Sequence, residues 1–222
     1  MTCIVGLEHQ GRVYIGGDSA GIAGTGLCVR ADAKVFRNGP FLMGFTTSFR
    51  MGQLLQFKLK PPPHPADVDT FEFLVGTFVE SVRSCLKTGG FAKRKEEQEI
   101  AGAFLVGYRG RLYTIDSDYQ VGQSADCFGA AGAGAQLALG ALHALDAILN
   151  CNYGDDSQSC CAVDPVHQVV REKTEFFLQK RFGRASFDKH PLITPEQRIT
   201  IALQAAERWN STVRSPFTVL SN

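Results

Sequence analysis

The sequence predicts an α+β protein built on antiparallel sheets, and two observations lead to this fold class. Strand-like apolar segments come in pairs, each pair joined by a short turn signal such as Asn38-Gly39. Helical segments also come in pairs, so the strand–helix alternation that builds a parallel sheet is not the pattern here. We therefore expect hairpins packed under paired helices.

Length and composition bound the class of protein. The 222 residues (24.2 kDa) predict a single domain over 1–222, and 44% hydrophobic with 20% charged residues is ordinary for a globular chain. A net charge of +1, evenly spread, gives no reason to expect nucleic acid or a membrane surface as a partner. No segment approaches the roughly 18 apolar residues that cross a bilayer, and the N-terminus lacks a signal-peptide pattern. We expect a cytoplasmic protein.

The cysteines and histidines do not form a metal-binding pattern. Seven scattered cysteines, an odd number, fit a reducing compartment with free thiols. Cys151, Cys160 and Cys161 gather in one polar segment, but no C-x-x-C or H-x-x-x-H spacing completes a zinc site. The five histidines are isolated, none with a partner four residues along. We predict no metal and no cofactor.

Two hairpins are predicted in the first part of the chain. Residues 2–8 and 12–17 form strands on either side of a Gln10-Gly11 turn. Residues 34–37 and 41–46 form a second pair on either side of Asn38-Gly39. Both pairs are rich in apolar and β-branched residues, as strands of a buried sheet are.

Two helices follow these hairpins. A helix is predicted over residues 48–59, and the stiff proline-rich segment "KPPPHPAD" terminates it. The next helix ends at Gly89-Gly90, and its apolar residues share one face: Phe71, Leu74, Val75, Phe78, Val82, Cys85 and Leu86.

A further hairpin is predicted after a charged segment. "KRKEEQE" (93–99) predicts a solvated connection, and residues 101–118 predict a hairpin that turns at Arg109-Gly110. The words "GRVYIGGD" from Gly11 and "GRLYTIDSD" from Gly110 are alike, which hints at two similarly built sheets.

Small residues open a predicted helix over 130–149. A glycine-rich lead into a helix can hold phosphate, but no Lys-Ser/Thr pair follows and no acidic residue marks a dinucleotide site. Close packing of an Ala/Gly-rich helix on a sheet is the better interpretation. Residues 150–163 then predict a loop and residues 164–182 a helix.

The chain ends in a helix and a strand. Thr194 is the predicted N-cap of the helix, with Pro195 at its first position and Gln197 at the capping-box position. "SPFTVL" predicts a short terminal strand.

One candidate nucleophile is Ser19, since "GDSAG" matches the G-x-S-x-G elbow of α/β-hydrolases. That elbow requires several strands before the serine and a long helix after it. Only one hairpin precedes Ser19, and the glycine-rich "AGIAGTG" follows. We therefore disfavour Ser19.

A second candidate is Thr2, exposed as the N-terminal residue if Met1 is removed. Its α-amine, with an ordinary pKa of about 7.7–8.0, can take the hydroxyl proton as the oxygen attacks a carbonyl. Lys34 can supply a positive charge that favours the ionised hydroxyl. Asp18, at the end of the second strand, can hold that lysine by a charge-assisted hydrogen bond.

At these residues the chain resembles the N-terminal-nucleophile hydrolases, specifically proteasome β-subunits and the HslV peptidase. The words that carry the resemblance are "TCIVGL", "VYIGGDSAG", "ADAKVFRNG" and "FLMGFTTS". Asp18 lies sixteen and Lys34 thirty-two positions after Thr2, the offsets that this family uses. The register selects Thr2 over Cys3 as the nucleophile. Weaker similarity covers most of the chain outside about 150–192, which stands as an insertion.

The resemblance implies a fold and a set of roles. The fold is a four-layer α-β-β-α sandwich of two stacked antiparallel sheets. Thr2 is the nucleophile and base, Lys34 lowers the hydroxyl pKa and Asp18 orients Lys34. The backbone N–H of Thr47 takes the oxyanion position that a glycine holds in the family, and the substrate pocket includes Phe45 and Gly21.

Two supporting positions depart from the family. Ala133 stands where the family has a serine near the active-site amine, and Asn210 falls where it has an aspartate. No long propeptide precedes Thr2, as in HslV, which suggests a bacterial or phage source.

The resemblance implies a threonine-type peptidase that acts on peptide or unfolded protein through an acyl-enzyme. It also implies a homo-oligomeric ring, with an ATP-dependent unfoldase as a partner by analogy. Two alternatives stay open: a non-proteolytic amidase acting on a small molecule, and a catalytically weak or inactive assembly subunit. The departures at Ala133 and Asn210, the long insertion and the presence of Met1 favour the latter.

Overall fold

The structure is a computed structural model that describes residues 2–91, 93–95, 98–150 and 193–222. The predicted helix 164–182, and the loop and insertion beyond residue 150, lie outside these residues. Every strand pairing in the described part is antiparallel. The predicted α+β class with antiparallel sheets is confirmed.

The first sheet has four strands in the order β12-β1-β2-β13. These are β1 (Cys3–His9), β2 (Arg12–Gly17), β12 (Phe128–Gly132) and β13 (Thr218–Ser221). The predicted N-terminal hairpin is its centre, and the predicted terminal strand is one edge.

The second sheet has five strands in the order β11-β10-β9-β6-β5. These are β5 (Val35–Asn38), β6 (Phe41–Phe45), β9 (Phe104–Tyr108), β10 (Arg111–Ile115) and β11 (Val121–Gly122). Two separate hairpins complete the strands: β3 (Ala20–Ala23) with β4 (Gly26–Val29), and β7 (Lys93–Lys95) with β8 (Gln98–Ile100). The segment 93–99 was expected to be a connection, so its strand pairing corrects that prediction.

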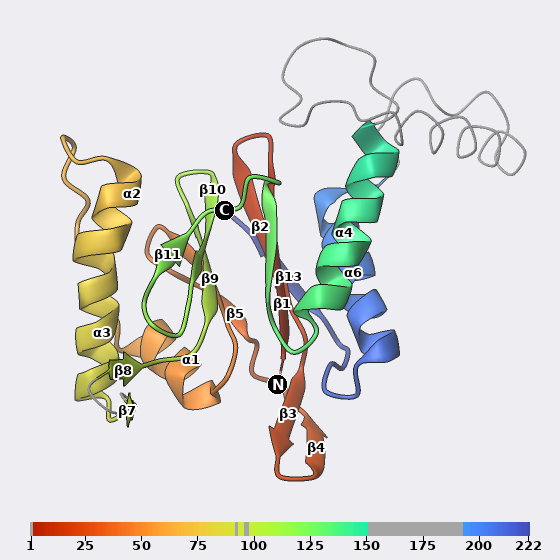
Figure 1. The fold of residues 1–222 in the computed structure, drawn as a ribbon, viewed down its shortest axis with the longest axis horizontal. Coiled ribbons are helices and arrows are strands. Elements are labelled where there is room, and N and C mark those ends of the chain that lie inside the picture. The colour runs from red at the N-terminus through yellow and green to blue at the C-terminus, as the bar shows by residue number, and fades with distance from the viewer. Residues whose placement is uncertain (1, 92, 96–97, 151–192) are drawn as a thin grey trace, which may run out of the picture.

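Helices lie outside both sheets (Figure 1). They are α1 (Phe49–Phe57), α2 (Thr70–Phe73), the π-turn η1 (Leu74–Phe78), α3 (Val79–Thr88), α4 (Ala135–Asn150) and α6 (Pro195–Trp209). The predicted capping box of α6 is present, with Thr194 and Gln197 exchanging hydrogen bonds. The single helix predicted to end at Gly89 is instead interrupted by the π-turn. No described helix is long and apolar enough to span a membrane.

Three apolar cores hold the sheets and helices together. The first strand shows how, since its residues alternate between two cores as the two-residue period of a strand requires. Cys3, Val5 and Leu7 pack under α4 and α6, whereas Ile4 faces the second sheet. The core between the sheets consists of Ile4, Val13, Ile15, Val35, Leu42, Leu105, Leu112 and Ala131. The third core lies between the second sheet and α1–α3.

Two matching turns join the sheets at one end. Gln10 and Gly11 have φ values of 49° and 71°, and Arg109 and Gly110 have 49° and 75°. Paired positive φ values mark the type I′ turn that suits the twist of a hairpin. A Cβ on Gly110 would lie 2.5 Å from the carbonyl oxygen of Gly11, so the two turns touch. The similar words in the sequence thus correspond to two contacting hairpins.

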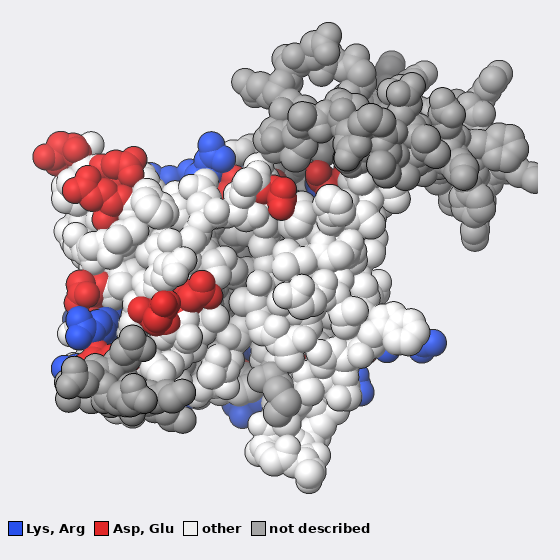
Figure 2. Space-filling model, in the orientation of Figure 1, with Lys and Arg blue, Asp and Glu red and all other residues white. Residues whose placement is uncertain are grey.

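The described surface has scattered charge. Figure 2 shows small acidic and basic groups separated by wide uncharged areas on this face, rather than one patch of a single sign. This view agrees with the even spread of charge along the sequence.

A substitution in α1 tests how closely this helix packs on the second sheet. An alanine Cβ at the buried Gly52 would lie 2.2 Å from the ring of Phe45. Gly52→Ala should therefore lower the free energy of unfolding by about 1–3 kcal/mol, as overpacking does. At Gly76, in η1, a Cβ would meet nothing within 4 Å, so Gly76→Ala should be neutral or stabilising by up to about 1 kcal/mol. Urea denaturation measures both, and equal effects would contradict the packing described.

Candidate active site

Antiparallel pairing places Thr2 and Asp18 at the same edge of the first sheet. Thr2 directly precedes β1 and Asp18 directly follows β2, and these strands pair with Ile4 opposite Gly17. The Cys3 N–H donates to Asp18 Oδ1 at 3.0 Å, and the Asp18 N–H donates to the Cys3 carbonyl at 3.2 Å. The carboxylate is thereby fixed to the residue next to Thr2.

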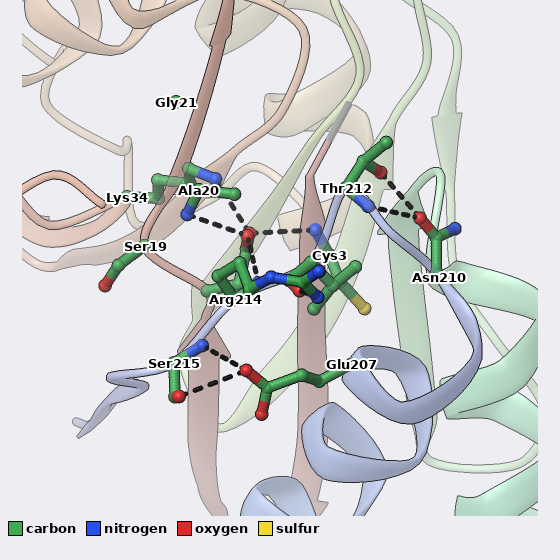
Figure 3. A network of polar contacts seen from close by, with 12 residues as sticks. Cys3, Ser19, Ala20, Gly21, Lys34, Glu207, Asn210, Thr212, Arg214 and Ser215 are labelled. Carbon is green, nitrogen blue, oxygen red and sulfur yellow. Dashed lines mark hydrogen bonds and ion pairs between the residues drawn. The ribbon is translucent and has the colours of Figure 1, made fainter. Parts of the chain in front are cut away.

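Lys34 and Asp18 form a buried ion pair. The Lys34 Nζ donates to Asp18 Oδ1 at 2.7 Å, and the side chains are 1% and 0% exposed. Asp18 Oδ2 accepts from the backbone N–H groups of Ala20 at 3.0 Å and Arg214 at 3.3 Å. Figure 3 shows these donors directed at one carboxylate. Because four donors, with that of Cys3, satisfy its oxygens, the carboxylate acts as a fixed anion that holds the lysine.

The protonation of the neighbouring groups suits this arrangement. Burial lowers the pKa of Lys34 below its ordinary value, and the Asp18 charge and hydrogen bond partly offset this. Burial, together with the Asp18 charge, raises the pKa of Cys3 to about 12. At neutral pH Cys3 is therefore a thiol and not a thiolate, which disfavours it as a nucleophile.

The backbone of Thr2 contacts the segment between β12 and α4, which was predicted to be the start of a helix. Residues 128–132 form β12, which corrects the predicted helix start at residue 130. The Gly134 N–H donates to the Thr2 carbonyl at 3.3 Å. Gly132 has a φ of 98°, and a Cβ there would lie 2.2 Å from the same carbonyl oxygen. Gly132 and Gly134 thus allow this segment to approach the backbone of Thr2 closely. This close approach accounts for the small residues before α4, and no bound phosphate is needed to explain them.

The two positions that depart from the family contact each other. Asn210 Nδ2 donates to the carbonyl of Ala133 at 2.8 Å. Its Oδ1 accepts from the backbone N–H of Thr212 at 2.9 Å and from the hydroxyl of Thr212 at 2.7 Å. Asn210 therefore links the end of α6 to the loop beside Thr2, and Figure 3 shows its two bonds with Thr212.

Thr47 has the backbone conformation that a glycine would favour. Its φ is 67°, which is strained for a β-branched residue. Its hydroxyl lies 3.1 Å from that of Thr46, which donates to the Ala103 carbonyl at 2.6 Å. The loop thus keeps a left-handed shape at the residue predicted to supply the oxyanion N–H.

The predicted pocket residues Phe45 and Gly21 are both buried. Phe45 is only 4% exposed and packs against Phe49, with ring centroids 5.6 Å apart. The Phe49 ring centroid is also 5.6 Å from the Lys34 Nζ. Gly21, in β3, is buried under the side chain of Arg30. Phe49 and Arg30 were not among the predicted site residues, although Phe49 directly follows "TTS" and Arg30 lies four residues before Lys34.

Ser19 is not placed as an elbow nucleophile. Its hydroxyl donates to the Pro216 carbonyl and its N–H to the Arg214 carbonyl at 2.8 Å. Ser19 is 7% exposed and ties the C-terminal segment to the end of β2. Among the described residues no group of three or more His, Cys, Asp or Glu side chains is arranged to hold a metal ion; Cys151, Cys160 and Cys161 lie outside those residues.

Comparison with solved structures identifies the fold. BPH from Thiobacillus denitrificans matches at a TM-score of 0.68 and 16% identity, over 100% of this chain and 97% of that one. A structure of the same protein in complex with epoxomicin matches at 0.66 and 16% identity, over 100% and 98%. HslV from Trypanosoma brucei matches at 0.56 and 16% identity, over 99% and 98%. Anbu from Yersinia bercovieri matches at 0.54 and 13% identity, over 99% and 81%.

These neighbours all have the proteasome-type N-terminal-nucleophile hydrolase fold, and this chain shares that fold. The predicted fold resemblance is confirmed. No protein-family model and no curated protein matches the sequence. At this identity the likeness concerns the fold alone.

Because the ion pair is buried, we expect the substitution Asp18→Asn to lower the free energy of unfolding strongly. Asp18→Asn keeps the side-chain shape but leaves the Lys34 ammonium buried without a counter-charge, so the free energy of unfolding should fall by about 3–5 kcal/mol. Asp32→Asn is the matched control, since Asp32 pairs with Arg30 at 2.7 Å but is 47% exposed. That change should cost at most about 1 kcal/mol. Similar losses in both variants under urea denaturation would contradict the importance of the buried pair.

Proposed function

We propose that this protein is an N-terminal threonine hydrolase of the proteasome/HslV type, which cleaves peptide bonds through an acyl-enzyme on Thr2 once Met1 is removed. The observation that carries the proposal is the buried Lys34–Asp18 pair, fixed by the backbone of Cys3 beside Thr2. A strongly desolvated cation held by a saturated carboxylate is typical of a functional site.

The chemistry follows from these groups. The free α-amine of Thr2 takes the hydroxyl proton, directly or through a water, as Oγ1 attacks the substrate carbonyl carbon. The Lys34 cation favours the ionised hydroxyl, and the Thr47 N–H donates to the oxyanion. The C–N bond then breaks, and the amine product leaves with the proton that the α-amine had taken. Water, activated by the same amine, hydrolyses the Thr2 ester and frees the nucleophile.

The remaining predictions belong to the same proposal. Phe45 and Gly21 line the pocket for a peptide or unfolded protein substrate. The family resemblance supports a homo-oligomeric ring in the cytoplasm, with an ATP-driven unfoldase as partner and a bacterial or phage source. The three apolar cores support a four-layer α-β-β-α sandwich formed by one domain, with an insertion over about 150–192.

The second candidate is an assembly subunit with little or no activity. It is favoured by Ala133 and Asn210, which bond to each other where the family has a serine and an aspartate. Without those side chains, proton transfer at the Thr2 amine has less support. An amidase acting on a small acylated amine is a further alternative, and a panel of peptide amides and acyl amino acids separates it from a peptidase.

Intact mass spectrometry tests the choice between enzyme and subunit. We expect a mass lacking Met1 and, after incubation with epoxomicin, which one BPH structure contains, a covalent adduct on Thr2. Thr2→Ser should keep the adduct, because it keeps a hydroxyl beside the amine, and Thr2→Ala should lose it. Complete retention of Met1, or an adduct that persists in Thr2→Ala, would rule out the threonine mechanism.

The pH profile of peptide cleavage is expected to be bell-shaped. Activity rises with pH as the Thr2 amine loses its proton, at an ordinary pKa of about 7.7–8.0. It falls again as Lys34 loses the positive charge that favours the ionised hydroxyl. Since burial lowers the pKa of Lys34 from its ordinary 10.5, the alkaline limb should have its midpoint below 10.5. Measuring kcat/KM across the range checks this, and a plateau extending beyond that value would contradict the role of Lys34.

A further inference from the structure

Arg30 lies between β4 and β5 and is held in one orientation by its neighbours. Its Nε and Nη2 donate to Oδ1 and Oδ2 of Asp32, both at 2.7 Å, in a bidentate pair. Its backbone N–H donates to the Ser19 carbonyl at 2.8 Å. A Cβ on Gly21 would lie 2.7 Å from Arg30 Cδ, so the aliphatic part of the side chain covers that glycine. These contacts restrict where the guanidinium can lie.

The guanidinium and the proposed catalytic lysine lie near the same aromatic ring. Its Cζ is 4.0 Å from the ring centroid of Phe49, and the Lys34 Nζ is 5.6 Å from the same centroid. Stacking of arginine on an aromatic face fixes the plane of the guanidinium. The Phe49 ring thus contacts the guanidinium and also lies near the proposed catalytic lysine.

One edge of this guanidinium is open to a ligand. Asp32 occupies the Nε/Nη2 edge, and among the described residues no group accepts a hydrogen bond from Nη1. The two side chains are 36% and 47% exposed, so the pair adds little stability. Its effect is to orient Arg30 so that a second, planar acceptor can bind the Nη1/Nη2 edge.

We propose that Arg30 is a specificity-determining residue that binds a substrate carboxylate, so that the enzyme prefers an acidic side chain next to the bond it cleaves. This inference depends on the proposed function. The charges around the position are compatible with it, since Lys34 is neutralised by Asp18 and, within the described part of the chain, Arg30 pairs with no acid other than Asp32. Arg30 Cδ also lies over Gly21, a residue of the proposed substrate pocket, which places the guanidinium at the border of that pocket.

The test compares fluorogenic peptides that differ only at the residue before the leaving group: glutamate, its neutral isostere glutamine, or leucine. Because the leaving group blocks the peptide terminus, only a side-chain carboxylate can be bound. For wild type we expect kcat/KM to favour glutamate over glutamine by about tenfold, the size of one charged hydrogen bond in a half-exposed site. The preference should shrink at high salt.

Variants assign the preference to one residue. Arg30→Gln should bring the glutamate-to-glutamine ratio close to one, while cleavage after leucine stays near wild type. Arg50→Gln is the matched control, because Arg50 is an exposed cation next to Phe49 whose Nη2 donates to the Gly89 carbonyl at 3.4 Å. It should keep the preference. Asp32→Asn removes the carboxylate that orients the guanidinium and should lower the preference. Thermal melting confirms that each variant is folded.

The outcomes separate this inference from the proposed function. Cleavage after leucine without a glutamate preference, or a preference that persists in Arg30→Gln, overturns the inference and leaves the hydrolase intact. If no peptide is cleaved, the proposed function fails, and fluorescence polarisation with labelled glutamate and glutamine peptide amides decides the role of Arg30. Tighter binding of the glutamate peptide that is lost in Arg30→Gln supports the inference, and equal binding of both peptides overturns it.

Discussion

The interaction on which this structure depends is the buried ion pair between Lys34 and Asp18. Removing two charges from water costs several kcal/mol each, and mutual attraction rarely gives a net gain over apolar packing. Here the cost is offset because the carboxylate also accepts from the backbone of Cys3, Ala20 and Arg214. Cys3 at the start of β1 and Arg214 in the C-terminal segment are distant from Asp18 in the sequence, so one carboxylate joins both to the turn between β2 and β3 beside Thr2.

The rest of the centre follows from how closely the backbone can approach Thr2. The Thr2 carbonyl occupies the space that a side chain at position 132 would fill, so only glycine fits there. The Gly134 N–H donates a hydrogen bond to the same carbonyl. Thr47 adopts a left-handed conformation without the freedom of glycine. Strain of this kind costs on the order of 1–3 kcal/mol and persists where the surroundings enforce it, which is typical of functional sites.

The sequence predicted those parts of the site that depend on side chains and hairpin spacing. Antiparallel pairing puts the residue before one strand beside the residue after the next, so the proximity of Thr2 and Asp18 followed from the Gln10-Gly11 turn. The backbone donors to Asp18 leave no trace in residue type and could not be predicted. β12 was missed because "FGAAG" has few β-branched or large apolar residues, and its pairing with β1 supplies what its propensity lacks. Arg30 was overlooked because a charge between short strands is ordinarily solvated.

The balance between enzyme and assembly subunit depends on what the ion pair contributes. For a chain selected only to fold and assemble, a well-packed apolar pair at Lys34 and Asp18 would serve as well or better, since replacing a buried ion pair in that way is often neutral or stabilising. Ala133 and Asn210 stand where the resemblance implies a serine and an aspartate, and these two departures favour the assembly subunit. However, both concern proton transfer at the Thr2 amine, where a water molecule can substitute for a hydroxyl. No water can substitute for the Lys34 charge at a site that is 1% exposed. In the proposed mechanism, the costly element is thus the one that this chain retains, and the elements it lacks are those that solvent can replace.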